Sequence, residues 1–139
     1  MELQRGRLID HVHLVVADIA ASKRFYAAVL GALGIPVGTS SPEHVQYDEL
    51  FISSTRLSAT HQATGRIHLA FATRDKALVE TFYTAGLAAG GRDNGPPGER
   101  PYHPGYYGAF LLDPDGNNIE AVFHGEATYS ADSVVISTP

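Results

Sequence analysis

Two stretches of the chain alternate between strongly apolar and less apolar positions, as strands do when one face is buried. The apolar positions of residues 9–16 share one face, and the opposite face carries His11 and His13. The apolar positions of residues 67–73 likewise leave His68 on the opposite face. We therefore expect two strands whose apolar faces pack on helices and whose histidine faces line a cleft.

An aspartate and a helical pattern follow each predicted strand. Asp18 and Asp75 stand where a carboxylate accepts hydrogen bonds from the free amides of a first helical turn. Apolar residues then recur at helical spacing through residues 19–33 and 78–87, and glycines at positions 34 and 90–91 end both patterns. The two aspartates are therefore interpreted as helix caps and not as catalytic acids.

The two strand–helix segments are copies of one another. A shift of 57 positions (68 − 11 = 57) places His11 on His68 and Gly34 on Gly91 without a gap. Such a repeat usually represents one supersecondary unit. Short strand candidates at 37–39, 45–47 and 50–54 complete the first unit, and candidates at 108–112 and 118–123 flank a DPDG turn in the second.

The predicted fold class is α+β, with two βαβββ units forming a cupped, barrel-like mixed β-sheet with flanking helices. We expect one domain over residues 1–125, with units at about 8–58 and 65–125, followed by a tail over 126–139. The tail is expected to be frayed or to add an edge strand at 134–136. Residues 92–104 are rich in Gly and Pro and are predicted to form a long functional loop.

Composition narrows the possible partners. The 139 residues suit one domain, and a net charge of −5 without a basic cluster argues against nucleic acid and anionic membranes as partners. No apolar run is long enough to cross a membrane, and the first residues lack the apolar core of a signal peptide, so we expect a cytoplasmic protein. The absence of cysteine excludes disulfides, thiolate metal ligands and cysteine nucleophiles.

Histidines and one glutamate are the candidate metal ligands. His11 and His68 occupy equivalent places in the repeat, and two histidines related in this way can converge on one point. Glu120 lies within the apolar run 119–123, where an ionised carboxylate is costly unless it is paired or bound to a metal.

The segments DHVHLVVADIAASKRFY, IHLAFAT and DPDGNNIEAVFHG make the chain similar to the vicinal oxygen chelate superfamily over residues 8–125. This superfamily includes glyoxalase I, extradiol dioxygenases and bleomycin resistance proteins. The resemblance implies a divalent metal held by His11, His68 and Glu120, a facial triad that leaves positions open for a substrate. Without sulfur ligands, Fe, Mn, Ni, Co and Zn are all compatible with this set.

The chain departs from two patterns of the superfamily. Glyoxalase I takes a fourth ligand, usually a glutamate, from the last strand of its first unit, and the residues from Phe51 to Ser53 cannot serve here. Asp48 or Glu49 could serve only through a register shift. Extradiol dioxygenases carry a histidine upstream of the DP turn and a tyrosine shortly before it. His103 matches the histidine, but residues 110–112 contain no tyrosine.

Further site residues are expected around the last hairpin. His103 and Tyr107 are the candidate catalytic residues, as proton donors or acceptors. His13, Tyr102 and Tyr106 are expected to line the substrate pocket. The alternatives are that His13 orients a ligand or fills space, and that the Tyr- and His-rich loop packs against a dimer neighbour.

The sequence thus predicts a metal-dependent enzyme that chelates two adjacent oxygens of a small substrate, with dioxygenase-like or glyoxalase/lyase-like chemistry. The alternative is a metal-free binding protein that sequesters a small hydrophobic or antibiotic-like ligand. A regulatory or assembly module is a weaker third interpretation. The resemblance also implies a homodimer, and it leaves open whether the site lies within one chain or across two.

Overall fold

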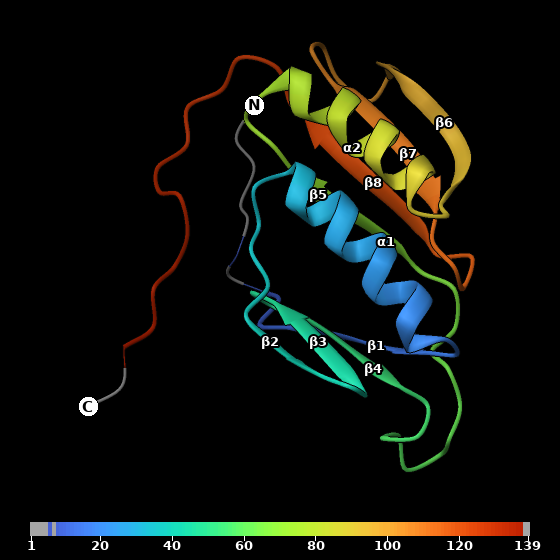
Figure 1. Cartoon of the computed structure of the whole chain (residues 1–139). Coiled ribbons are helices and arrows are strands. Elements are labelled where there is room, and N and C mark those ends of the chain that lie inside the picture. The colour runs from blue at the N-terminus through green and yellow to red at the C-terminus, as the bar shows by residue number, and fades with distance from the viewer. Residues whose placement is uncertain (1–5, 7, 138–139) are drawn as a thin grey trace.

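The computed structural model describes residue 6 and residues 8–137 and contains two units of one plan (Figure 1). The first unit contains β1 (Val12–Val16), α1 (Ile19–Ala32), β2 (Thr39–Ser41), β3 (His44–Tyr47) and β4 (Leu50–Ser54). The second contains β5 (His68–Ala72), α2 (Lys76–Ala88), β6 (Arg92–Glu99), β7 (Tyr107–Leu112) and β8 (Asn118–Phe123). Each unit therefore has the predicted order βαβββ.

Each unit forms its own four-stranded mixed sheet. The strand orders are β1-β4-β3-β2 and β5-β8-β7-β6, so the first strand of each unit pairs in parallel with the last. The remaining pairs are antiparallel. The predicted fold class of two βαβββ units with flanking helices is confirmed, and the sheets are cupped without closing into a barrel.

Both helices begin and end as their sequences predict. The Asp18 carboxylate accepts from the Ala21 amide at 3.0 Å, and the Asp75 carboxylate accepts from the Ala77 amide at 2.9 Å. Gly34, just beyond α1, has a positive φ of 80°, a conformation that favours glycine at a helix end. Neither helix of the described chain is long and apolar enough to span a membrane.

The two helices pack side by side, and this contact joins the units (Figure 1). A Cβ on Gly86 of α2 would lie 2.2 Å from Leu111 Cδ1 and 2.8 Å from Val29 Cγ1, so only glycine allows the helix to approach α1 and β7 this closely. The apolar faces of the strands, including Leu14 and Leu111, lie in the shared core. The histidine faces are turned away from that core.

One buried carboxylate also connects the two units. Asp113, 1% exposed in the β7–β8 turn, accepts a 2.6 Å hydrogen bond from the Tyr26 hydroxyl of α1. The same carboxylate accepts from the amides of Asp115 and Asn117, at 2.9 and 2.8 Å, and from the Asn117 side chain at 2.9 Å. Burial, together with the charge of Asp113, raises the pKa of Tyr26 far above its usual value, so this hydroxyl remains a donor.

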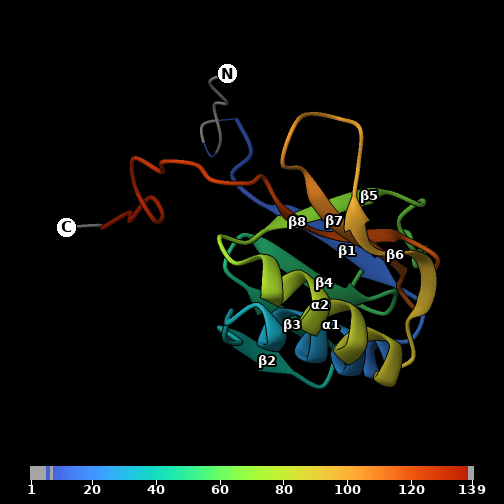
Figure 2. The same cartoon turned by 90° about the horizontal axis from the view of Figure 1, so that it is seen from above.

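The prediction of a loop over residues 92–104 was wrong for most of its length, because residues 92–99 form β6. β6 pairs with β7 through two register shifts, between Asp93 and Gly95 and between Gly95 and Gly98. It is the outermost strand of its sheet, where prolines that lack an amide are tolerated and bulges are common. The remaining loop, residues 100–106, rises beyond the sheets (Figure 2).

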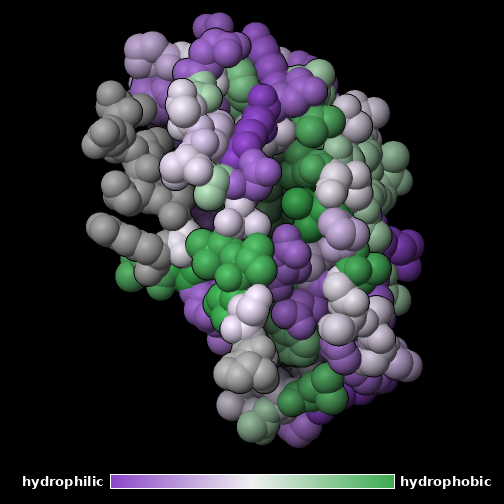
Figure 3. Space-filling view, turned by 90° about the vertical axis from the view of Figure 1, so that its left-hand side faces the viewer, coloured by the Kyte–Doolittle hydropathy of each residue, from purple (hydrophilic) through white to green (hydrophobic). Residues whose placement is uncertain are grey.

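The tail runs along one side of the molecule without forming the edge strand considered for residues 134–136 (Figure 1). Arg74 holds it through Asp132 at 2.5 Å, the Ala131 carbonyl at 3.0 Å and the Tyr129 ring at 4.1 Å. The side from which both ends of the chain emerge carries separate hydrophobic groups among hydrophilic ones (Figure 3). The exposed apolar residues near the two ends are Leu8, Ile9, Val134, Val135 and Ile136.

Candidate functional site

The outer face of the second sheet holds a buried carboxylate at its centre. Glu120 of β8 lies opposite Ala70 of β5 on one side and Phe110 of β7 on the other, and it is 1% exposed. Its Oε2 lies 2.8 Å from Nε2 of His68, and its Oε1 accepts a hydrogen bond from the Tyr106 hydroxyl. The structure thus brings together two of the three predicted metal ligands and one predicted pocket residue.

Glycine at position 108 makes room for this carboxylate. A Cβ there would lie 3.0 Å from Glu120 Oε1 and 3.3 Å from Tyr106 Cε1. A larger residue at this position would require the carboxylate and the Tyr106 ring to shift by a few tenths of an ångström. Burial and the hydrogen bond to Glu120 raise the pKa of Tyr106 well above its usual value, so Tyr106 donates to Glu120 throughout the neutral range.

Two histidines, His103 and His124, lie against the ring of Tyr106. His103 Nδ1 lies 2.9 Å from the Pro104 carbonyl, which can only accept, so this nitrogen carries the proton. In neutral His103, Nε2 then accepts from Nδ1 of His124, 2.9 Å away. The two rings stack at 5.2 Å, and Tyr106 meets both edge-on at 5.3 and 5.5 Å.

His103, Tyr102 and Tyr106 are therefore gathered beside Glu120, with the Tyr102 ring 4.9 Å from that of Tyr106. His124 belongs to the same group, although it was not among the predicted site residues. The available signal was its spacing, because residues 120 and 124 share a face when the strand direction continues past Phe123.

Tyr107 does not join this group. It points to the opposite face of β7, where its hydroxyl donates to Glu80 of α2 and Lys76 lies 4.4 Å from its ring. Neighbouring residues of a strand face opposite ways, so only one of Tyr106 and Tyr107 can reach Glu120. Its place among the predicted catalytic residues is thus corrected, and Tyr106 has the position that was expected of Tyr107.

The outer face of the first sheet is aromatic. His13 Nε2 lies 2.8 Å from Ser53 Oγ, and its ring is 4.8 Å from that of Phe51. Residues His11, His13, Gln46 and Phe51 line an open cavity of about 280 Å³. This cavity lies on the other sheet from Glu120, and the role of His13 in a substrate pocket stays a prediction.

His11 stays on the first sheet, exposed, with Nδ1 2.6 Å from Asp10 Oδ1. Within residues 6 and 8–137, no three His, Asp or Glu side chains come together as a metal site requires. His68 and Glu120 nevertheless have the donor types that a divalent metal takes, and they converge on one point. A single chain thus supplies two of the three predicted ligands at one place.

Strand register identifies what replaces Glu120 in the first unit. Ala70 pairs with Glu120, and its repeat equivalent, His13 (70 − 57 = 13), pairs with Phe51. Phe51 thus stands where a glyoxalase-type fourth ligand would stand. The register pairs neither Asp48 nor Glu49 with His13.

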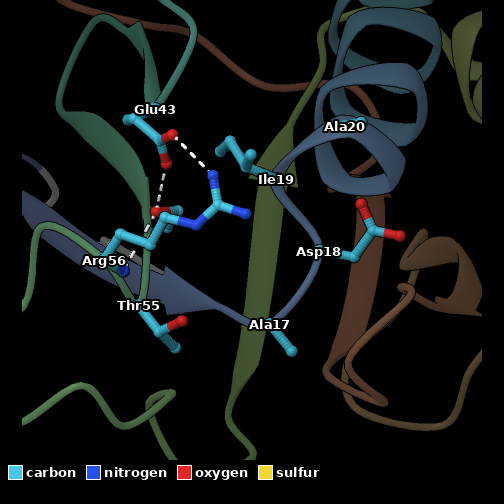
Figure 4. A pocket seen from close by; sticks show the side chains of 8 residues that line it. Ala17, Asp18, Ile19, Ala20, Glu43, Thr55 and Arg56 are labelled. Atoms are coloured by element: carbon cyan, nitrogen blue, oxygen red, sulfur yellow. Dashed lines mark hydrogen bonds and ion pairs between the residues drawn. The ribbon is translucent and has the colours of Figure 1, made fainter.

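A second cavity, of about 380 Å³, opens at the start of α1 (Figure 4). Glu43 accepts there from Ser54 at 2.5 Å and pairs with Arg56 at 3.0 Å, and these contacts lower the pKa of Glu43, the Ser54 hydrogen bond most. The Asp18 carboxylate is engaged in capping the helix. The residues that line this cavity include no histidine, so it offers fewer donors for a divalent metal than the Glu120 face.

Comparison with known proteins identifies the family. The model of the Glyoxalase/Bleomycin resistance protein/Dioxygenase superfamily matches residues 8–121. No curated protein matches the chain significantly. The structure of a glyoxalase/bleomycin resistance protein from Albidiferax ferrireducens is 35% identical, with 84% of this chain and 98% of that one covered and a TM-score of 0.71.

Two more distant structures share the fold. A glyoxalase-related enzyme from Fulvimarina pelagi is 22% identical, with 90% of this chain and 99% of that one covered and a TM-score of 0.65. A lactoylglutathione lyase from Agrobacterium tumefaciens is 23% identical, with 85% and 94% covered and a TM-score of 0.62. The chain therefore belongs to the Glyoxalase/Bleomycin resistance protein/Dioxygenase superfamily, which is the vicinal oxygen chelate superfamily.

Proposed function

We propose that this protein is a metal-dependent enzyme that acts on a small substrate with two adjacent oxygens. The observation that carries the proposal is the pairing of buried Glu120 with His68, whose side chain is 51% exposed. A carboxylate is rarely buried at a sheet centre unless it is paired or bound to a metal. Here it faces an imidazole that solvent and ligands can reach.

His68 Nε2 and Glu120 Oε2 would hold the divalent metal, with Fe, Mn, Ni, Co and Zn all suited to these donors. Metal binding at Nε2 would require the imidazole proton that now faces Glu120 to sit on Nδ1 instead. Tyr106 engages the other carboxylate oxygen and would keep Glu120 a ligand through Oε2 alone.

The third ligand, His11, would come from a second copy of the chain. β1 and β5 are edge strands, each with one neighbour within its sheet, and an unpaired edge is a natural place for another chain. Joining the first unit of one chain to the second unit of another would bring the His11 face toward the His68 face. In a twofold homodimer this happens twice, giving two equal sites.

The bound metal would chelate two adjacent oxygens and stabilise the negative charge that develops on an enolate or catecholate. Residues of the chain would transfer protons and bind the remainder of the substrate. The His103–His124 pair is placed to hold or pass a proton beside Tyr106. The aromatic cavity around Phe51 would bind the apolar part of the substrate and exclude water from it.

The first test is elemental analysis of untagged protein purified without added metal. Near-stoichiometric metal that is lost in His68→Ala supports the proposal. Its identity sorts the chemistry, with iron or manganese pointing to ring-cleaving oxygenation and nickel, cobalt or zinc to isomerase or lyase chemistry. A protein that contains no metal and takes up none when it is offered would rule the enzyme proposal out.

A mixing experiment tests whether two chains share the site. His11→Ala and Glu120→Ala should each lose metal alone, whereas a mixture of both unfolded and refolded together should recover it. Half of the randomly paired dimers combine both variants, and each of these has one intact site of two, so about a quarter of the wild-type metal content is expected. A site within one chain would show no recovery.

The second candidate is a metal-free protein that sequesters a small hydrophobic or antibiotic-like ligand. It is favoured by two observations on the described residues: both Glu120 oxygens already have partners within the chain, and an aromatic cavity of about 280 Å³ opens on the other sheet. It predicts ligand binding that is indifferent to chelators. The metal analysis above separates the two candidates.

A further inference from the structure

We infer that Arg100 recognises a carboxylate on the molecule that binds next to Glu120. The inference rests on the proposed site but goes beyond it, because it specifies the chemical class of the substrate: two adjacent oxygens together with an anionic group. The inference rests on three observations: the position of Arg100, its lack of an acidic partner within the described part of the chain, and the backbone of β6 that holds its side chain.

Arg100 lies beside the Glu120 group. Its guanidinium is 5.3 Å from the centre of the Phe110 ring, and that ring is 5.9 Å from the ring of His68. Phe110 is directly opposite Glu120 in the strand register. The Arg100 amide also donates to the Tyr106 carbonyl at 3.0 Å. A molecule that contacts His68 and Phe110 is therefore within reach of the guanidinium.

The charge of Arg100 is not neutralised within the described chain. Its Nη1 donates to the Glu99 carbonyl at 3.2 Å and its Nη2 to the Pro96 carbonyl at 2.7 Å. Among residues 6 and 8–137, no Asp or Glu oxygen lies within 4.0 Å of it, whereas Arg56 and Arg74 both pair with acids. A guanidinium has five N–H groups, so three remain for a ligand.

The bulged strand β6 is shaped to hold this side chain. A Cβ on Gly98 would lie 2.9 Å from Arg100 Nη1, and one on Gly95 would lie 3.3 Å from Nη2. The same two glycines mark the register shifts of β6, and Gly95 has a φ of +144°, which other residues rarely adopt. The Gly- and Pro-rich run therefore positions a half-buried guanidinium by backbone contacts alone.

The positive charge of Arg100 would favour the binding of an anionic substrate. An anionic substrate that approaches this face meets the negative charge of Glu120, and a fixed guanidinium offsets that repulsion. The planar fork of arginine matches a planar carboxylate with two parallel hydrogen bonds. The guanidinium also lies over the Phe110 ring, a contact that favours the charged form at this place.

Two probes that differ by one carboxylate test this inference: catechol and 3,4-dihydroxybenzoate. Their dissociation constants would be measured by titration calorimetry under nitrogen, with and without zinc, on the wild type, Arg100→Gln and Arg100→Lys. Arg24→Gln is the matched control, because it removes one positive charge from an exposed position of α1, on the other side of the sheets.

The wild type and Arg24→Gln should bind 3,4-dihydroxybenzoate about 10- to 100-fold more tightly than catechol, the range expected for a charge-assisted pair. Arg100→Gln should bind both probes equally, and Arg100→Lys should keep part of the preference. Zinc affinity should be the same in all four proteins. Equal binding of the two probes by the wild type, a preference that survives in Arg100→Gln, or no binding of either probe would overturn the inference.

The measurements of zinc binding distinguish a failure of this inference from a failure of the proposed function. A carboxylate preference that depends on Arg100 in a protein that never binds metal would support the anion site and refute the metal enzyme. Stoichiometric zinc without any carboxylate preference would do the reverse.

Discussion

The two units of this protein share a backbone plan but not a chemistry. Both have an aspartate-capped helix and a first strand paired in parallel with the last, yet the equivalent position of the last strand is Phe51 in one unit and Glu120 in the other. Around Phe51 the outer face is aromatic, whereas around Glu120 it is a hydrogen-bonded group with His68 and Tyr106. The repeat thus preserves strand register, and one side chain at one register position decides what the face can bind.

The two positions also differ in what their burial costs in folding free energy. A buried carboxylate is costly, and the second unit offsets the cost with two hydrogen-bond partners and with the space that Gly108 leaves. The first unit carries no such cost at Phe51. A costly buried carboxylate that is present in only one of the two copies of the repeat is a good candidate for a functional residue.

The largest effect should come from breaking the connection between the units. Asp113→Ala removes the acceptor of the Tyr26 hydroxyl and of the turn amides in a buried place. We expect a loss of about 3–5 kcal/mol in the free energy of unfolding, because several buried donors are left unpaired. Urea unfolding followed by circular dichroism at fixed protein concentration measures it.

Asp132→Ala is the control for this change, since Asp132 is an exposed partner of Arg74 in the tail. It should cost less than about 1 kcal/mol, as exposed ion pairs do. If Asp113→Ala were no more harmful than this control, the buried carboxylate would not be what holds the units together.

The second-largest effect should come from changes at the two equivalent positions, Glu120 and Phe51. Glu120→Gln keeps the size of the side chain but removes its charge, and we expect metal affinity to fall by at least about 100-fold, beyond the loss typical of residues that only support a ligand. Phe51→Leu, the matched change in the first unit, should leave metal affinity unchanged and weaken binding of an aromatic ligand. Competition with a chromophoric chelator measures the metal affinities. Equal losses of metal in both variants would contradict the division of roles between the units.

Two adjacent tyrosines allow a finer comparison. Tyr106→Phe removes the hydroxyl that orients Glu120 and should weaken metal binding by about 10-fold, the lower end for a supporting hydrogen bond. Tyr107→Phe removes a hydroxyl that contacts Glu80 on the opposite face of β7 and should leave metal binding unchanged. The same chelator competition applies, and the reverse order of effects would show that β7 presents its other face to the site.

The smallest effect is a change in pH dependence. The pKa of folded Tyr26 is raised above that of the unfolded chain, so its contribution to stability is complete below about pH 10 and is lost as the pH rises and the unfolded tyrosine ionises. Above that pH, the wild type should lose up to about 1.4 kcal/mol per pH unit from this residue, and Tyr26→Phe should lack this part of the decline. Urea unfolding at pH 8, 10 and 11 measures both slopes. Parallel slopes would show that Tyr26 is not held protonated.

Much of the architecture could be predicted from the sequence because it depends on local patterns. Apolar periodicity, the two capping aspartates and the DPDG turn specify the helices and most strands through neighbouring residues. β6 could not be predicted in this way, since its glycines and prolines are typical of a loop. It becomes a strand because β7 offers an edge along which two bulges absorb the irregular residues.

The candidate site was predicted in its parts but not in its assembly. The repeat indicated His68, and the apolar run around Glu120 indicated a buried acid, and the structure brings these two together. The choice of Tyr106 over Tyr107 depends on which face of β7 packs on α2. Likewise, His124 joins the group only because the loop over residues 100–106 folds back on the end of β8.

The sequence by itself determined the two-unit plan, the capped helices and the residue types available for a metal site, because each follows from spacing along the chain. Only the tertiary structure decided that His11 stays apart from His68 and Glu120, that Phe51 takes the place of a second acid, and that Arg100 lies beside Phe110 without an acidic partner among residues 6 and 8–137. These outcomes depend on how helices and sheets pack across long separations in sequence. Local periodicity does not encode that packing, since it arises from the fit of whole surfaces such as the close approach of the two helices at Gly86.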